Sequence, residues 1–272
     1  MPEIIQTVVG FGVMGLLCWW LEKLWPEKPD QPAWRPDSAL DLAYMGLRIL
    51  LSALVVVATF FVGYKGVPQH RNTLVSLQPF WLQAVEFLVI GDFVAYWVHR
   101  YMHFQPFLWR IHAVHHSAPQ IDWIVSARDH PLELVIQKLS STIVLYLLGF
   151  SPGLFAAYVP LVATYSLLIH SNLTWTYGPF GYLFTSPAFH RWHHSSEPEA
   201  IDKNFSQNFA IFDYLFGTAY CPRHRVSQVY GLVGKQLAPN MWLQLLYPFQ
   251  KPQTPAAPVE AKESPIEPIS ET

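Results

Sequence analysis

Ten of the twelve histidines in this 272-residue chain fall between residues 99 and 194, and their spacing is regular. Imidazole is a common ligand of zinc, copper, iron and nickel, so a dense histidine cluster indicates a metal centre. The pattern is one HxxxH pair, two HxxHH motifs and two isolated histidines: His99 and His103; His112, His115 and His116; His190, His193 and His194; His130 and His170. The other two, His70 and His224, lie outside this pattern and are expected to be ordinary residues.

The HxxHH spacing favours more than one metal ion. Residues three and four apart share one face of a helix, so the first histidine of each motif has a neighbour at both distances. Those two neighbours are consecutive residues, about 100° apart around the helix axis. They do not easily converge on one ion, but they can reach two adjacent ions. The spacing therefore predicts two metals, while the ligand type leaves their identity open.

The composition indicates a protein of the lipid bilayer. Hydrophobic residues make up 51% of the chain and charged residues 13%, whereas soluble domains carry about a quarter charged residues. The chain also has 11 Trp, 13 Tyr and 18 Phe, and amphipathic aromatic residues collect at membrane interfaces. A net charge of −2 does not indicate a nucleic-acid-binding protein, which would typically carry an excess of positive charge. Two cysteines, Cys18 and Cys221, argue against a disulfide framework and a thiolate metal site.

Five apolar stretches approach the length of about 20 residues that a membrane-spanning helix needs. They are Ile4–Leu21, Leu40–Val62, Phe80–Val98, Leu132–Phe150 and Leu154–Ile169. The first has no preceding basic segment and is expected to be a retained span rather than a signal peptide. The last is short and contains Pro160, and a Gly-Pro-rich turn joins it to the fourth as a helical hairpin. The expected fold is an all-α integral membrane protein with four to five transmembrane helices and a cytoplasmic, histidine-rich helical cap.

The order of the expected spans puts the histidines at one membrane face. His99 ends the third span, His130 precedes the fourth and His170 ends the fifth. Most Lys and Arg residues near the spans fall on that same side, which the positive-inside rule makes cytoplasmic. The membrane is expected to be the plasma membrane in a bacterium and the endoplasmic reticulum in a eukaryote.

Asp92 and Arg48 are charged residues inside apolar runs. Asp92 is on one helical stripe with His99 and His103, and ionisable groups within spans are usually functional. Metal-bound imidazoles commonly donate their second N–H to a carboxylate, so we hypothesise that Asp92 orients a histidine or relays protons. The alternative is a polar contact between helices. Arg48 is expected to reach out of the membrane towards Asp37 or Asp41.

Segments around the histidines carry a second pattern. Asp92–Arg100 leads into the HxxxH pair, Arg128–Glu133 precedes the hairpin, and Ser186–His194 holds the last motif. A strand-like stretch, Asp202–Phe205, and the segment Ile211–Thr218 follow. With the order of the histidines, these segments resemble the fatty acid hydroxylase superfamily, which includes sterol desaturases, carotene hydroxylases and alkylglycerol monooxygenases. The resemblance covers residues from about 80 to 220.

This resemblance implies an oxidoreductase that holds two iron ions and uses dioxygen to hydroxylate or desaturate a lipid. It implies the following ligands: His99, His103, His112, His115, His116, His170, His190, His193 and His194, with His130 as a further candidate. A sterol or related terpenoid is the first candidate substrate. The chain contains no His-Pro-Gly-Gly haem signature, so electrons are expected from a separate donor protein.

The expected domain organisation has three parts. Residues 1–78 form N-terminal transmembrane helices, residues 79–248 a histidine-box di-metal oxidase domain, and residues 249–272 a disordered, Pro-rich tail.

Two other classes share some of these features. A zinc-dependent membrane hydrolase usually carries a glutamate beside its histidines, as in HExxH, and these motifs contain no carboxylate. A metal transporter places its ligands near the middle of the bilayer, whereas these histidines lie at one face. The oxidase interpretation is therefore preferred over both.

Overall fold

The computed structural model describes residues 2–66, 74–222 and 224–251, and over these ranges it is all-helical. The five long helices are α1 (Pro2–Leu24), α2 (Ser38–Gly66), α3 (Phe80–Phe104), α5 (Pro131–Leu147) and α6 (Pro152–His170). The short helices are α4 (Pro106–His112), α7 (Pro187–His193), α8 (Ile211–Leu215) and α9 (Met241–Leu246). Short 3₁₀ turns are η1 (Val75–Leu77), η2 (His115–Ser117), η3 (Trp123–Ala127), η4 (Gly178–Tyr182), η5 (Pro198–Ala200) and η6 (Tyr247–Phe249).

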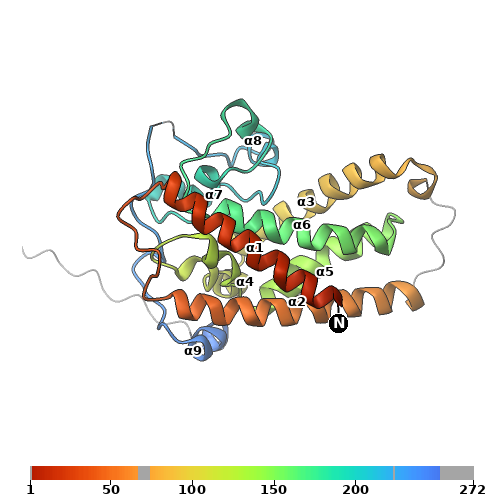
Figure 1. Cartoon of the computed structure of the whole chain (residues 1–272), viewed down its shortest axis with the longest axis horizontal. Helices are drawn as coiled ribbons and strands as arrows, with labels where there is room; N and C mark the ends of the chain where they lie inside the picture. The colour runs from red at the N-terminus through yellow and green to blue at the C-terminus, as the bar shows by residue number, and fades with distance from the viewer. Residues whose placement is uncertain (1, 67–73, 223, 252–272) are drawn as a thin grey trace, which may run out of the picture.

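The long helices form a bundle, and the short elements gather at one end of it as a cap (Figure 1). Helix α3 packs against α5 and α6, and α2 packs against α5 and α6. The cap contacts the bundle where α3 meets α4, where α6 meets α7, and where both α2 and α6 meet η3. The ends of α3 and α6 and the start of α5 therefore reach the same end of the molecule, as the sequence predicted.

Helix starts in the cap are set by proline and by side-chain caps. Pro106 and Pro187 begin α4 and α7, and proline suits the first helical turn because its missing N–H would have no partner there. The Gln105 side chain accepts from Leu108 N at 2.7 Å, and Ser186 Oγ accepts from Phe189 N at 3.2 Å. The first HxxHH motif begins at the last residue of α4 and continues into η2, and the second lies at the C-terminal end of α7.

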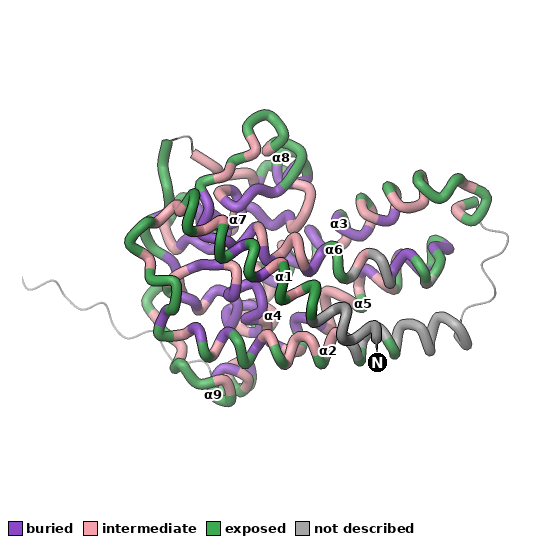
Figure 2. Tube along the Cα trace, viewed as in Figure 1, coloured by how far each residue is buried: buried purple, intermediate pink, exposed green. Residues whose placement is uncertain are grey.

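Apolar side chains face outwards along α3. Trp81, Val85, Val89, Phe93 and Trp97, spaced four residues apart, are all exposed. The opposite face of α3 is buried, and in Figure 2 burial concentrates in the cap and its junction with the bundle. By length and apolar composition, two of the described helices could cross a membrane: Phe80–Phe104 and Gly153–His170. The predicted third and fifth spans match these helices, whereas the predicted total of four to five spans remains an expectation.

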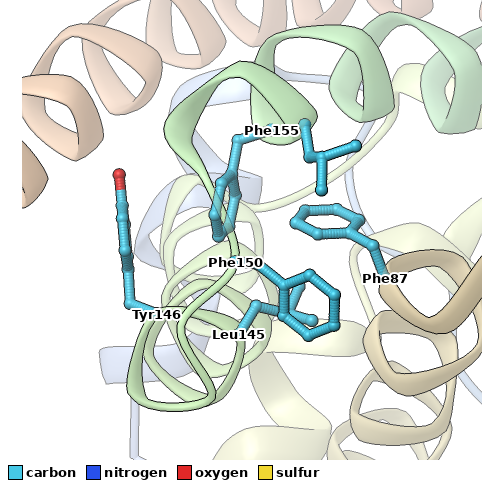
Figure 3. Packing of buried hydrophobic residues seen from close by; sticks show 6 residues of the cluster. Phe87, Leu145, Tyr146, Phe150 and Phe155 are labelled. Carbon is cyan, nitrogen blue, oxygen red and sulfur yellow. The ribbon is translucent and has the colours of Figure 1, made fainter. Parts of the chain in front are cut away.

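An aromatic cluster joins α3 to the α5–α6 hairpin (Figure 3). The ring of Phe87 meets Phe150 and Phe155 edge-on, with centroids 5.4 and 4.7 Å apart. Gly149, with φ of +92°, makes the turn between the two helices, which confirms the predicted hairpin. The far end of the bundle, away from the cap, is therefore closed between these helices by packed aromatic rings.

A buried ionic network holds the start of α2 against the cap. Arg35 binds Asp122 at 2.5 Å and Asp41 at 2.8 Å, and Arg128 binds Asp41 and, at 3.2 Å, Asp37. Removing one partner from such a network leaves an uncompensated charge in the interior, so its members hold one another in place.

Two predictions about this region are corrected. Arg48 forms its ion pair with Asp129, at 2.9 Å, because the acidic groups of Asp37 and Asp41 are bound by Arg128. The stretch 202–205 is irregular rather than strand-like, because Asp202 and Asn204 have φ of +57° and +59°, in the left-handed region.

Candidate metal centre

The structure brings nine of the predicted histidines into two adjoining groups, and within each group the ligand nitrogens all lie within 4.8 Å of one another. The first group, called group A, comprises His99, His103, His112, His116 and His193. The second, called group B, comprises His115, His170, His190 and His194. All nine side chains are buried or nearly so.

In both groups the Nε2 atoms converge. In group A, His112 Nε2 lies 2.9 Å from His99 Nε2 and 3.1 Å from His116 Nε2. In group B, His170 Nε2 lies 3.2 Å from His115 Nε2 and 3.0 Å from His190 Nε2. A neutral imidazole carries a proton on only one nitrogen, so convergent Nε2 lone pairs can be directed at a common cation.

Consecutive histidines fall in different groups. His115 belongs to group B and His116 to group A, and the same division separates His194 from His193. This is the arrangement that the HxxHH spacing predicts, because consecutive side chains leave a helical turn in different directions. Each HxxHH motif therefore links the two groups, and a change in one short helix would affect both.

Backbone carbonyl groups fix the orientation of three rings. His99 Nδ1 donates to Phe205 O at 2.6 Å, His193 Nδ1 to Lys203 O at 2.9 Å, and His170 Nδ1 to Ser166 O at 2.7 Å. A proton held on Nδ1 leaves Nε2 as the acceptor, and the ligand tautomer is thereby selected.

Carboxylates perform the same task for three further rings. His112 Nδ1 lies 2.7 Å from Glu133, His115 Nδ1 3.0 Å from Asp129, and His103 Nδ1 3.1 Å from Asp202. Sequence reasoning assigned no role to these acidic residues. The sequence could have indicated this role, because these residues lie in the segments Arg128–Glu133 and Asp202–Phe205 beside the histidine motifs. Metal-binding histidines commonly have carboxylate partners.

Burial keeps the cap histidines neutral. Desolvation, followed by repulsion from neighbouring imidazoles, lowers the pKa of His112, His116 and His193 well below its usual value. Although burial alone would raise the pKa of Asp129, the Arg48 guanidinium and the His115 hydrogen bond lower it to about 2. At neutral pH the imidazole lone pairs are therefore free to bind a cation, and the Asp129 carboxylate is ionised.

Two predicted site residues are placed elsewhere. His130 belongs to neither group, because its Nδ1 accepts from Leu132 N at 3.1 Å and its Nε2 contacts Leu245 O at 3.0 Å. Its position before α5 is that of a helix cap. Asp92 accepts from Asn208 Nδ2 at 2.6 Å and Phe209 N at 2.8 Å, and within the described residues it orients no histidine directly. Its carboxylate holds the 208–209 backbone, which lies between η5 and α8, so this polar contact joins α3 to an irregular segment and not to another helix. The hypothesis that Asp92 relays protons stays a prediction.

The arrangement fits a pair of metal ions. His103 Nε2 is buried and finds no hydrogen-bond partner within the described ranges, and it is the atom that its Asp202 contact leaves available. A buried polar atom without a partner is costly, and a cation among the group A nitrogens would satisfy it. Group B offers a second set of imidazoles of the same chemistry.

A cavity reaches both groups from the bundle. Its lining includes His99 and His112 of group A and three histidines of group B, His115, His170 and His190. Helix α5 contributes a polar wall, Glu133, Gln137 and Lys138, and α2 contributes Arg48. A second cavity continues between α3, α5 and α6 and shares Gln137, Lys138, Val162 and Gln207 with the first. A molecule in this space would lie directly against the histidines.

Comparison with known proteins gives consistent matches. A family model described as fatty acid hydroxylase matches residues 84–218. The chain is similar to ornithine lipid hydroxylase OlsE of Rhizobium tropici, with 31% identity over 232 residues, covering 85% of this chain and 70% of that protein. It is 31% identical over 146 residues to alkylglycerol monooxygenase of Caenorhabditis elegans, covering 54% of this chain and 28% of that protein. A very-long-chain aldehyde decarbonylase of Oryza sativa subsp. indica is 31% identical over 179 residues, 63% of this chain and 67% of that protein. No solved structure matches significantly.

Proposed function

Because this chain belongs to the fatty acid hydroxylase superfamily, we propose that it is a membrane enzyme that uses two iron ions and dioxygen to hydroxylate a lipid. The observation that carries the proposal is the sorting of nine buried histidines into two adjoining groups at the wall of one cavity. The relatives named above include a lipid hydroxylase and a monooxygenase, which supports hydroxylation over desaturation as the reaction.

Group A would hold one iron and group B the other, through their Nε2 atoms. Bound there, iron supplies the one-electron and dioxygen chemistry that amino-acid side chains lack. The residues of this chain fix the ligands: Phe205 O, Glu133 and Asp129 hold the Nδ1 protons of three rings. A substrate in the second cavity would lie between the packed α3, α5 and α6 helices, which would limit the access of water to it.

The substrate is proposed to be a lipid with a polar head group. One relative, whose match covers 85% of this chain, is named for an ornithine lipid, and a second relative is named for alkylglycerols. The cavity is lined by Arg48, Gln137, Lys138 and Gln207, which suit a polar group better than the sterol ring system expected from the sequence.

The proposal includes a topology. Helices α3 and α6 cross the membrane together with α1, α2 and α5, and the cap faces the cytoplasm, where a separate protein donates electrons. The predicted oxidase domain, residues 79–248, contains all nine grouped histidines. The exposed apolar side chains of α1, α2 and α5, among them Val13, Leu54 and Ile143, support the membrane contact of these helices.

The test is expression of the chain in a host that lacks it, with metal analysis of the detergent-purified protein and lipid analysis of the cells. The expected result is about two irons per chain, one for each histidine group, and a new lipid that carries one additional oxygen atom. Zinc as the bound metal, with ester hydrolysis and no dependence on dioxygen, would reject the proposal in favour of a hydrolase.

A further inference from the structure

Lys138 stands apart from the other polar residues at the junction of the two cavities. Four residues line both cavities, and the only charged one is Lys138. The two glutamines are bonded to each other, since Gln207 Nε2 donates to Gln137 Oε1 at 2.5 Å. Gln137 Nε2 also donates to Glu133 at 3.0 Å. Over the ranges that the structure describes, Lys138 makes neither a hydrogen bond nor an ion pair.

Among the cationic residues that line the cavity, Arg48 already has an anionic partner. Arg48 is paired with Asp129 at 2.9 Å, and Asp129 also holds His115. One oxygen of Glu133 accepts from both His112 and Gln137. This leaves the Lys138 ammonium as the positive charge without a partner. An ammonium group held between packed helices is costly unless an anion or several hydrogen bonds accompany it.

The position of Lys138 relates it to the metal centre. Glu133, the partner of His112, lies five residues earlier on α5, so Lys138 lies about 7.5 Å further along the helix axis. Beyond Lys138 the second cavity is lined by Leu145 and Phe155, which belong to the aromatic cluster of Figure 3. Lys138 therefore lies between the histidines and this end of the second cavity, whose lining also includes Ser141, Thr142 and Tyr158.

We infer that Lys138 binds an oxyanion of the lipid substrate, a carboxylate or phosphate, and so selects lipids that are oxidised close to an anionic group. This inference rests on the proposed lipid oxidation and names the substrate class for that site. A charge-assisted hydrogen bond from the ammonium would fix the anionic group, and the carbon atoms next to it would face the histidines. Long uncharged chains would lack this anchor.

The experiment compares N-dodecanoylglycine with its methyl ester, which lacks the negative charge and carries one more methyl group, in their binding to the purified, iron-loaded protein without dioxygen. The wild type is expected to bind the carboxylate about tenfold more tightly than the ester. Lys138→Met should remove this preference and Lys138→Arg should retain it. Lys23→Met is the matched control, because Lys23 is an exposed residue stacked on Trp19 outside the cavities, and it should leave the preference unchanged.

Several outcomes would overturn the inference. One is an equal affinity of the wild type for acid and ester, and another is an unchanged preference in Lys138→Met. Displacement of the probe by free acetate at the same concentration would show that the site takes a small anion rather than a lipid. If Lys138→Met lost iron while keeping the preference, the lysine would serve the unpartnered Glu133 oxygen instead. Binding without turnover separates this inference from the proposed oxidation, which fails independently if no oxidised lipid forms.

Discussion

His112 and Glu133 form the shortest of the three histidine–carboxylate contacts at the metal centre, with Nδ1 2.7 Å from Oε1. His112 is the last residue of α4, and Glu133 lies in the first turn of α5. Both are almost fully buried, so the hydrogen bond forms where water does not compete. This contact joins a helix of the cap to a helix of the bundle through a predicted metal ligand.

Glu133→Ala is therefore expected to weaken metal binding, because His112 loses the group that fixes its tautomer and ring orientation. Loss of such a partner commonly costs about 10- to 100-fold in metal affinity. The measurement is the rate of iron loss to a chelator from purified protein. Glu133→Gln, which keeps an acceptor oxygen, should lie between Ala and wild type. The exposed Glu199→Ala is the control, and iron loss from Glu133→Ala at the rate of this control would contradict the prediction.

A pair of histidine substitutions tests the grouping. His193→Ala removes a group A nitrogen and is expected to lower bound iron towards one per chain, together with lipid oxidation. His130→Ala removes a histidine from the same cap but from neither group, so the iron content should stay at the wild-type value. Metal analysis of both purified variants makes the comparison. Iron loss in His130→Ala without a change in folding would show that His130 is a ligand after all.

Asp92→Asn is expected to destabilise the protein without removing iron. The Asp92 carboxylate accepts from the backbone N–H groups of Asn208 and Phe209 and from the Asn208 side chain. An amide has one acceptor oxygen, and its NH₂ group would face these donors, at a cost of about 1–3 kcal/mol. The measurements are the thermal midpoint and the hydrogen exchange of residues 204–210. Iron loss with unchanged exchange of this loop would instead support the original hypothesis of a direct role at the metals.

The ionic network at the start of α2 predicts a large effect of Arg128→Met. This substitution leaves Asp37 without its guanidinium partner and Asp41 with Arg35 alone, and breaking a buried pair typically costs about 3–5 kcal/mol. Arg225→Met, which breaks a pair with Glu197 on a half-exposed arginine, should cost no more than about 1 kcal/mol. Protease susceptibility and thermal unfolding in detergent compare the two. Equal effects would show that the buried network adds little to the stability of the cap.

The sequence by itself determined the local features of this protein. The positions of proline and glycine predicted the hairpin. The predicted spans that end at His99 and His170 placed these two residues at one end of the bundle. Both predictions were possible because the length of an apolar stretch and the residues that break a helix are local properties of the sequence. The HxxHH spacing separated His115 from His116 for the same reason, since the direction of a side chain on a helix depends only on its place in the turn.

Only the tertiary structure decided the contacts between distant segments. His130 is a histidine next to the start of a helix at the metal end, and Asp92 is a carboxylate on the same helical stripe as His99. In the folded protein, however, His130 contacts Leu245 and Asp92 contacts Asn208. Glu133 took the role that the sequence had suggested for Asp92. The packing of α2, α3, α5 and α7 against one another decides which carboxylate contacts which imidazole. It also decides which lysine remains unpaired beside the cavity. The spacing of residues along a single helix does not determine how helices pack against one another.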